Sequence, residues 1–131
     1  DYFSGGAYQP EALAAFDQLL RDHRTGEVAP IDPRLFDLLH KLAAGAGCAA
    51  RFAVISGYRS PLTNAMLNAR SSGVASRSLH MQGLAIDVRL PGCPSDRLRD
   101  LALGRQVGGV GYYRASDFVH LDVGRIRSWS G

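Results

Sequence analysis

The sequence predicts an α+β domain in which an antiparallel sheet carries helices on one face and leaves its other face open. Segments with helical periodicity come first, and short segments with alternating apolar and polar residues follow them. The late strands are joined by short, hairpin-like connections, which favour antiparallel pairing. Two of these strands have three apolar residues on one face and a polar residue in the middle of the other. We therefore expect one catalytic domain over residues 1–131, with residues 1–9 as an N-terminal arm.

Composition limits the classes of function. The chain has 131 residues, of which 46% are hydrophobic, enough for one core. The formal charge is +3, but the arginines are spread along the chain, so we expect no nucleic-acid partner. No apolar run approaches the roughly 20 residues of a membrane span, and we expect a monomer without one.

Two helices are predicted in the first part of the chain. Pro10 begins a helix that runs to about Arg24, and its apolar face is formed by Leu13, Phe16, Leu19 and Leu20. Asp32 caps a second helix, which begins at Pro33, ends at Gly45 or Gly47, and aligns Leu35, Leu38, Leu39 and Leu42. The histidines of these helices, His23 and His40, are expected at the surface.

Strands and shorter helices alternate in the rest of the chain. We predict strands over residues 51–58, 83–89, 108–113 and 118–123. A helix capped by Ser60-Pro61 should run to about Arg70, and Ser95 should cap another that contains Leu98 and Leu101. A polar loop is predicted over residues 74–79, before the strand at 83–89.

Three of the polar residues in this part of the chain fit a zinc site. Alternation points Leu84, Ile86 and Val88 to one face of their strand and Asp87 to the other. In the last strand Val119 and Leu121 point to one face and His120 points to the other. His80 lies seven residues before Asp87. Two imidazoles and a carboxylate suit zinc with an open position for a water that the metal would activate.

The general base of such a site would lie near the metal without binding it. Asp117, three residues before His120, is the best candidate, although strict alternation places it on the opposite face and a bulge or turn must redirect it. Asp117 could instead cap the turn, and Ser78 could cap its loop. Asp122 could orient a ligand histidine, but we favour a solvated side chain.

The two cysteines, Cys48 and Cys93, exclude a four-cysteine zinc site. They could form a disulfide in an oxidising compartment or remain buried thiols. The sequence leaves both possibilities open.

Several motifs resemble one family. Ser78-x-His80-x-x-Gly83-x-Ala85-x-Asp87, followed by Asp117-x-x-His120, resembles the zinc D,D-peptidase and hedgehog-like superfamily. Its small, single-domain murein endopeptidases are the closer match. Further matching segments are Ser56–Pro61, Gly109–Tyr113, Phe118–Trp129 and, more loosely, Arg21–Gly26.

The resemblance implies a zinc-dependent hydrolase of peptide crosslinks in bacterial peptidoglycan, acting in the periplasm or cell envelope. His80, Asp87 and His120 would hold Zn²⁺, and Asp117 would be the general base. Arg59 would stabilise an oxyanion or anchor a substrate carboxylate, and Ser78 would contact the stem peptide. A plain salt bridge is the alternative for Arg59.

One residue departs from the family pattern. The better-known dipeptidases have Glu at the base position, whereas this chain has the shorter Asp117. The motifs leave open a second function, a zinc-containing cell-wall or protein binding module without hydrolysis, because hedgehog-like relatives imply that the fold can keep its metal without peptidase activity. The choice between endopeptidase and carboxypeptidase also remains open.

Overall fold

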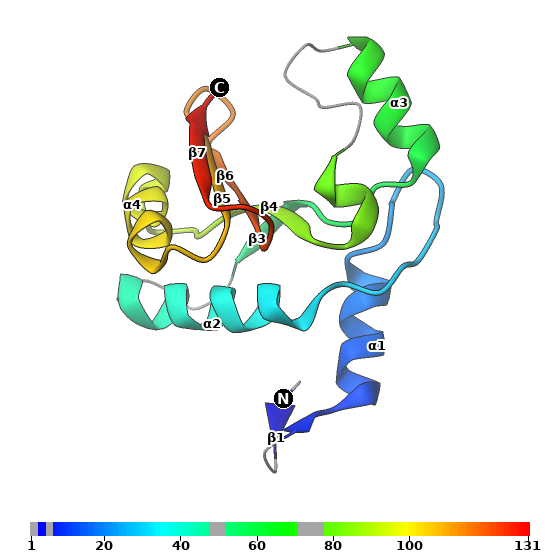
Figure 1. Cartoon of the computed structure of the whole chain (residues 1–131), viewed down its shortest axis with the longest axis horizontal. Coiled ribbons are helices and arrows are strands. Elements are labelled where there is room, and N and C mark those ends of the chain that lie inside the picture. The colour runs from blue at the N-terminus through cyan, green and yellow to red at the C-terminus, as the bar shows by residue number, and fades with distance from the viewer. Residues whose placement is uncertain (1–2, 5–6, 48–51, 71–77) are drawn as a thin grey trace.

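The computed structural model describes residues 3–4, 7–47, 52–70 and 78–131 and shows an α+β fold (Figure 1). Its helices are α1 (Pro10–Leu19), α2 (Pro33–Ala46), α3 (Pro61–Arg70) and α4 (Ser95–Arg105), with a short 3₁₀ helix η1 (Leu79–Gln82). The strands of the main sheet are β3 (Ala53–Ser56), β4 (Ala85–Arg89), β5 (Gly109–Tyr113), β6 (Phe118–Asp122) and β7 (Arg127–Ser130). The arm contains a two-stranded pair, β1 (Phe3–Ser4) and β2 (Ala7–Tyr8).

The main sheet has the strand order β3-β4-β6-β5-β7. All neighbouring pairs are antiparallel except β5 and β7, which are parallel. The α+β class and the antiparallel centre of the sheet are confirmed. The strand β7 is an addition to the prediction, since residues 127–130 have no clear alternation of apolar residues.

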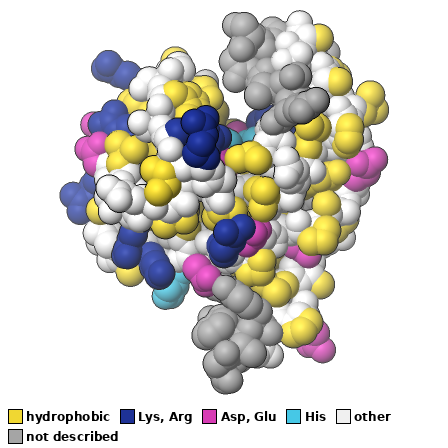
Figure 2. Space-filling model, in the orientation of Figure 1, with side chains coloured by type: hydrophobic (Ala, Val, Ile, Leu, Met, Phe, Trp, Pro, Cys, Tyr) yellow, Lys and Arg dark blue, Asp and Glu magenta, His cyan; other side chains and the backbone are white. Residues whose placement is uncertain are grey.

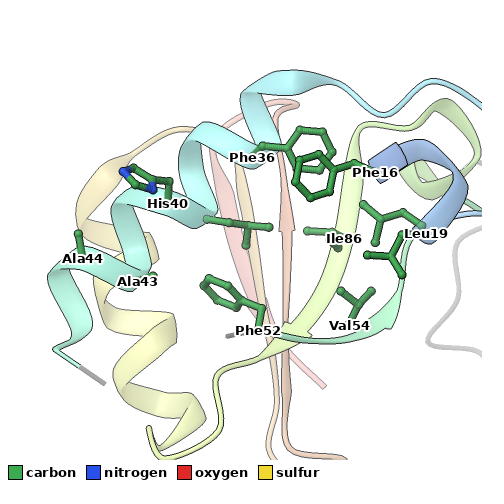
Figure 3. Close-up of a pocket in the computed structure, with 11 residues that line it drawn as sticks. Phe16, Leu19, Phe36, His40, Ala43, Ala44, Phe52, Val54 and Ile86 are labelled. Atoms are coloured by element: carbon green, nitrogen blue, oxygen red, sulfur yellow. The ribbon is translucent and has the colours of Figure 1, made fainter. Parts of the chain in front are cut away.

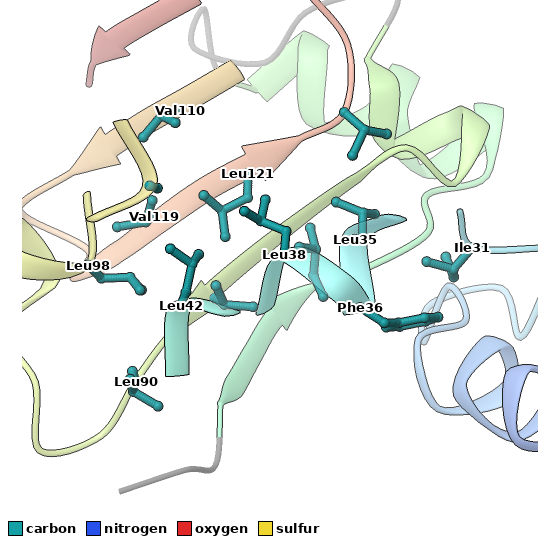
Figure 4. Packing of buried hydrophobic residues seen from close by; sticks show 14 of the residues in the cluster. Ile31, Leu35, Phe36, Leu38, Leu42, Leu90, Leu98, Val110, Val119 and Leu121 are labelled. Atoms are coloured by element: carbon teal, nitrogen blue, oxygen red, sulfur yellow. The ribbon is translucent and has the colours of Figure 1, made fainter. Parts of the chain in front are cut away.

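The apolar face of the sheet packs on α2 and α4 (Figure 4). Val88 and Val119 lie directly opposite each other in the register, as do Ile86 and Leu121. These four side chains are at most 1% exposed and join the leucines of α2 in one core. Each strand residue between them therefore points to the opposite face of the sheet.

The first helix ends five residues earlier than predicted, at Leu19 rather than Arg24. The reason is Asp22, whose Oδ1 accepts hydrogen bonds from the backbone N–H groups of Arg24 (2.9 Å) and Thr25 (3.2 Å). An aspartate that satisfies the following N–H groups in this way favours a turn over a helix. The second helix matches the prediction, with Asp32 as its N-cap and Gly47 in the left-handed conformation at its end.

An apolar groove of about 460 Å³ lies between α1, α2 and β3 (Figure 3). Phe16 and Phe36 meet at its upper edge with ring centroids 4.7 Å apart, and Phe52, Val54 and Ile86 line its sheet side. Ile86 belongs to the core face of β4, so this groove and Asp87 lie on opposite faces of the sheet.

No helix among the described residues is long and apolar enough to cross a membrane. Arginine and lysine side chains form separate groups rather than one patch on the face shown in Figure 2. His23 and His40 are exposed, as predicted. Cys48 and most of the predicted loop at 74–79 lie outside the described residues, so the disulfide stays a prediction.

Candidate metal centre

A row of residues crosses the open face of the sheet from β3 to β7. In the strand register Ser56 lies opposite Asp87, Asp87 opposite His120, His120 opposite Gly111, and Gly111 opposite Trp129. A register shift in β3, between Val54 and Ser56, brings Ser56 into this row. The sheet therefore places Asp87 and His120 side by side, as their alternation predicted.

His80 reaches the same place from η1. Ser78 is the N-cap of η1, and its Oγ accepts a hydrogen bond from the His80 backbone N–H at 3.2 Å. Gly83 ends η1 with φ +69°, and a Cβ at this position would collide with the Pro30 carbonyl oxygen. A side chain at Gly83 would thus be both strained and obstructed. The seven-residue spacing between His80 and Asp87 is explained by this turn between η1 and β4.

Three donor atoms converge at the centre of the row. Asp87 Oδ1 lies 3.1 Å from His80 Nε2 and 2.9 Å from His120 Nδ1. One ligand atom from each residue lies within 4.8 Å of the others, and all three side chains are largely buried. Two nitrogens and one carboxylate oxygen are a common donor set for a catalytic zinc ion with an open position.

The outer nitrogens of both histidines are held by acceptors. His80 Nδ1 lies 2.8 Å from the Gly57 carbonyl oxygen, and His120 Nε2 lies 2.8 Å from Asp122 Oδ2. Both outer nitrogens must therefore carry protons, which leaves the lone pairs of neutral imidazoles on the inner nitrogens. Because those lone pairs face the Asp87 carboxylate, a proton or a metal ion must lie between them. The residues thus fit a bound divalent cation.

The electrostatics of the cluster favour positive charge at its centre. Burial acts to raise the pKa of Asp87, but the charge of His80 and the hydrogen bonds from both histidines outweigh it and lower that pKa. Burial acts to lower the pKa of His120, but its hydrogen bonds to Asp122 and Asp87 outweigh burial and raise that pKa. The carboxylate therefore stays ionised and ready to bind a cation.

The prediction of a solvated Asp122 is wrong. Asp122 is fully buried, and besides His120 its carboxylate accepts hydrogen bonds from the backbone of Gly109 and Gly124 and from Arg127. Its two contacts with the Arg127 guanidinium are 2.9 and 3.0 Å long. Alternation correctly placed Asp122 on the open face, but it could not show that the segment around Arg127 covers that part of the face.

We expect Asp122→Asn to weaken metal binding while leaving all three ligands in place. An asparagine cannot accept from His120, Arg127 and two backbone N–H groups together, so a buried donor loses its partner at a cost of about 1–3 kcal/mol. Losing the acceptor that orients His120 should lower the affinity for zinc about 10- to 100-fold. Competition with a chromogenic chelator measures this, with Asp100→Asn on the exposed face of α4 as the matched control. Equal affinities for both variants would contradict the orienting role.

An aromatic group lies beside His120. The Trp129 ring is 5.0 Å from the His120 ring between centroids, and Trp129 Nε1 donates to Tyr113 Oη at 2.8 Å. Tyr113 in turn stacks on Phe118 with ring centroids 4.6 Å apart. A Cβ on Gly111 would lie 2.5 Å from the Trp129 ring, so the glycine makes room for the indole. Trp129 had no predicted role, although its place in the motif that contains His120 was a usable signal.

Arg59 contacts the cluster directly. Its Nη2 donates to Asp87 Oδ2 at 3.2 Å and its Nε donates to Ser56 Oγ at 3.3 Å. The Arg59 backbone N–H also donates to the His80 carbonyl oxygen at 3.0 Å. Arg59 thus lies next to two of the candidate ligands, and its Nη1 has no hydrogen bond to another described residue.

Asp117 and Ser78 do not join the cluster. Asp117 has φ +55°, its side chain is 65% exposed, and Ser95 Oγ donates to its Oδ1 at 2.5 Å. Its Oδ2 lies 3.9 Å from Arg89 Nε, and its described partners include none of the three candidate ligands. The turn predicted for Asp117 is present, but here it directs the carboxylate to the start of α4. The Ser78 hydroxyl serves as the cap of η1.

Comparison with known proteins identifies close relatives. The model of the peptidoglycan L,D-endopeptidase MepK family, within peptidase M15, matches residues 1–129. The chain is 43% identical over 129 residues to the peptidoglycan L,D-endopeptidase MepK of Escherichia coli K12, covering 98% of the chain and 71% of that protein. It is 42% identical over 125 residues to a probable peptidoglycan L,D-endopeptidase MepK of Haemophilus influenzae, covering 95% of the chain and 67% of that protein. No solved structure matches the chain.

Proposed function

Because the chain belongs to the peptidoglycan L,D-endopeptidase MepK family, we propose that it is a zinc-dependent hydrolase of peptide crosslinks in peptidoglycan. The name of the relatives specifies the bond, which joins an L-configured centre to a D-configured one. The observation that carries the proposal is the convergence of His80, Asp87 and His120 on one point of the open sheet face.

These three residues would hold the metal. The outer hydrogen bonds to Gly57 and Asp122 keep the inner nitrogens of His80 and His120 available as ligands. When bound, zinc polarises a carbonyl oxygen and lowers the pKa of a bound water. A polar groove lined by Arg59, Asp87 and Phe118 adjoins the donor atoms and offers room for a peptide substrate.

Arg59 and Asp117 would act on the substrate and on the attacking water. Arg59 is held by Ser56 and Asp87, and its remaining donors can bind an oxyanion or a substrate carboxylate. Asp117 would accept a proton from the attacking water, which requires its exposed carboxylate to leave Ser95 and turn toward the metal. Ser78 would contribute mainly by fixing η1 and thereby His80.

The substrate also implies a location. Peptidoglycan lies outside the cytoplasmic membrane, so an enzyme of this kind would act in the periplasm or cell envelope. Its partner there would be the stem peptides of the cell wall.

Digestion of purified crosslinked muropeptides tests the proposal. Zinc-loaded protein should convert crosslinked dimers to monomers, as read by mass spectrometry, and a chelator should abolish the reaction until zinc is restored. The masses of the products distinguish endopeptidase cleavage between stem peptides from carboxypeptidase release of a terminal residue. Protein that holds stoichiometric zinc and leaves all muropeptides intact would instead support the binding module.

A further inference from the structure

A polar groove of about 280 Å³ extends from the metal centre toward the turn that follows α1. We call it the arginine groove and define it by Arg24, His23, Tyr58, Arg59, Asp87 and Phe118. Asp87 and Arg59 form its inner end, next to the candidate ligands. Its outer end is formed by the turn at residues 22–27, which no part of the proposed mechanism uses.

The turn is rigidly attached to the wall of the groove. Asp22 is 3% exposed, and its Oδ2 accepts a hydrogen bond from the Ser60 backbone N–H at 2.8 Å. The Tyr58 backbone N–H donates to the Leu20 carbonyl oxygen at 2.8 Å. In Figure 1 the chain after α1 accordingly passes beside the start of α3. The backbone of Arg24, itself bonded to Asp22, is therefore held in place relative to Arg59.

The negative charges near the outer end of the arginine groove are those of Asp22 and Glu27, both of which act on Tyr58. Asp87 is engaged by Arg59 and the histidines, and the Asp22 carboxylate is engaged by backbone N–H groups. The Arg24 side chain is exposed and has neither an ion pair nor a hydrogen bond to any described residue. Arg24 and Arg59 both line this groove, and Arg59 is already paired with Asp87. Arg24 therefore presents a guanidinium without a bound carboxylate to a ligand in the groove.

We propose that Arg24 forms an anion subsite at the outer end of the arginine groove, where it binds a carboxylate of the substrate peptide. The inference rests on the proposed function, because it takes the scissile bond to lie at the metal and Arg59. A peptide that extends from that point along the groove brings a neighbouring acidic group to Arg24. A guanidinium on a fixed backbone can bind such a carboxylate through two parallel hydrogen bonds.

A pair of crosslinked peptides tests this subsite. In the first pair, the carboxylate nearest the scissile bond on one side is free in one peptide and amidated in the other. A second pair makes the same change on the other side of the scissile bond. For the pair on the groove side, wild-type protein should prefer the free acid about 10- to 100-fold in kcat/KM, mainly through KM. Arg24→Ala should remove that preference and leave cleavage of the amide unchanged. Arg24→Lys should restore part of it, and Arg105→Ala, an exposed arginine at the end of α4, should behave like wild type.

The outcomes separate the subsite from the function. An Arg24→Ala variant that keeps the wild-type preference in both pairs, or that loses activity equally on acid and amide, would overturn the subsite and leave the hydrolase intact. Wild-type protein that cleaves neither peptide would overturn the hydrolase. In that case the binding of the same peptides, measured by calorimetry, tests whether the subsite exists. The subsite requires that wild type bind the acid more tightly than the amide and that Arg24→Ala bind both equally.

Discussion

Replacing Asp87 with asparagine is expected to remove both zinc and hydrolysis. Asp87 Oδ1 contacts His80 and His120, and Asp87 Oδ2 contacts Arg59, so this carboxylate is bonded to three side chains of the centre. Asparagine keeps the shape but removes the negative charge that offsets a divalent cation among buried groups. Because changing an outer partner of a ligand already costs about 10- to 100-fold in affinity, we expect the loss of this ligand to exceed about 100-fold.

Metal analysis after dialysis and the muropeptide assay measure the two effects. Zinc should fall from one ion per chain to a small fraction of that, and crosslink cleavage should fall with it. The control compares the thermal unfolding of the chelated variant with that of chelated wild type, because the neutral side chain also loses its charge contact with Arg59. Stoichiometric zinc in a folded Asp87→Asn protein would show that the ligands have been misassigned.

Replacing Asp117 with asparagine is expected to abolish most hydrolysis while zinc remains bound. A positioned general base contributes about 10²- to 10⁴-fold to the rate, and asparagine cannot accept the proton. Asp117 is three residues from His120 but contacts none of the candidate ligands in this structure, so zinc content should not change. The measurement is kcat on crosslinked muropeptide, with zinc content determined on the same sample.

Ser95→Ala is the matched control for Asp117. It removes the 2.5 Å hydrogen bond that holds the Asp117 carboxylate at the start of α4 but leaves the carboxylate itself. If Asp117 is the base, Ser95→Ala retains activity and Asp117→Asn does not. If Asp117 only stabilises the turn before β6, both variants should lose stability and neither should lose much kcat.

Strand alternation was sufficient to predict that Asp87 and His120 share one face of the sheet. It placed Asp87 and His120 on the face opposite Ile86, Val88 and Val119, and the strand register agrees. The same local patterns predicted α2 from its Asp32 cap to its terminal glycine. These features depend on residues close in sequence or on a periodicity that the sheet imposes, so they can be read without tertiary structure.

The features that were missed depend on side-chain contacts that no periodicity of the sequence reveals. The first helix stops early because Asp22 bonds to its own turn and to Ser60, 38 residues further along the chain. Asp122 is buried because Arg127 folds back over it from a parallel strand that has little apolar alternation. From sequence alone, a polar residue on an open sheet face is predicted to be exposed to solvent unless the segment that covers it is known.

The row that crosses the open face has a consequence for how the protein folds. Because side chains alternate with a period of two, moving β4 against β6 by one residue would exchange every inward and outward position. Val88 or Val119 would then face the metal, and Asp87 or His120 would enter the core. A divalent cation can therefore bind only a chain whose strands are in the native register. Zinc held by His80, Asp87 and His120 would therefore stabilise the native register over slipped pairings.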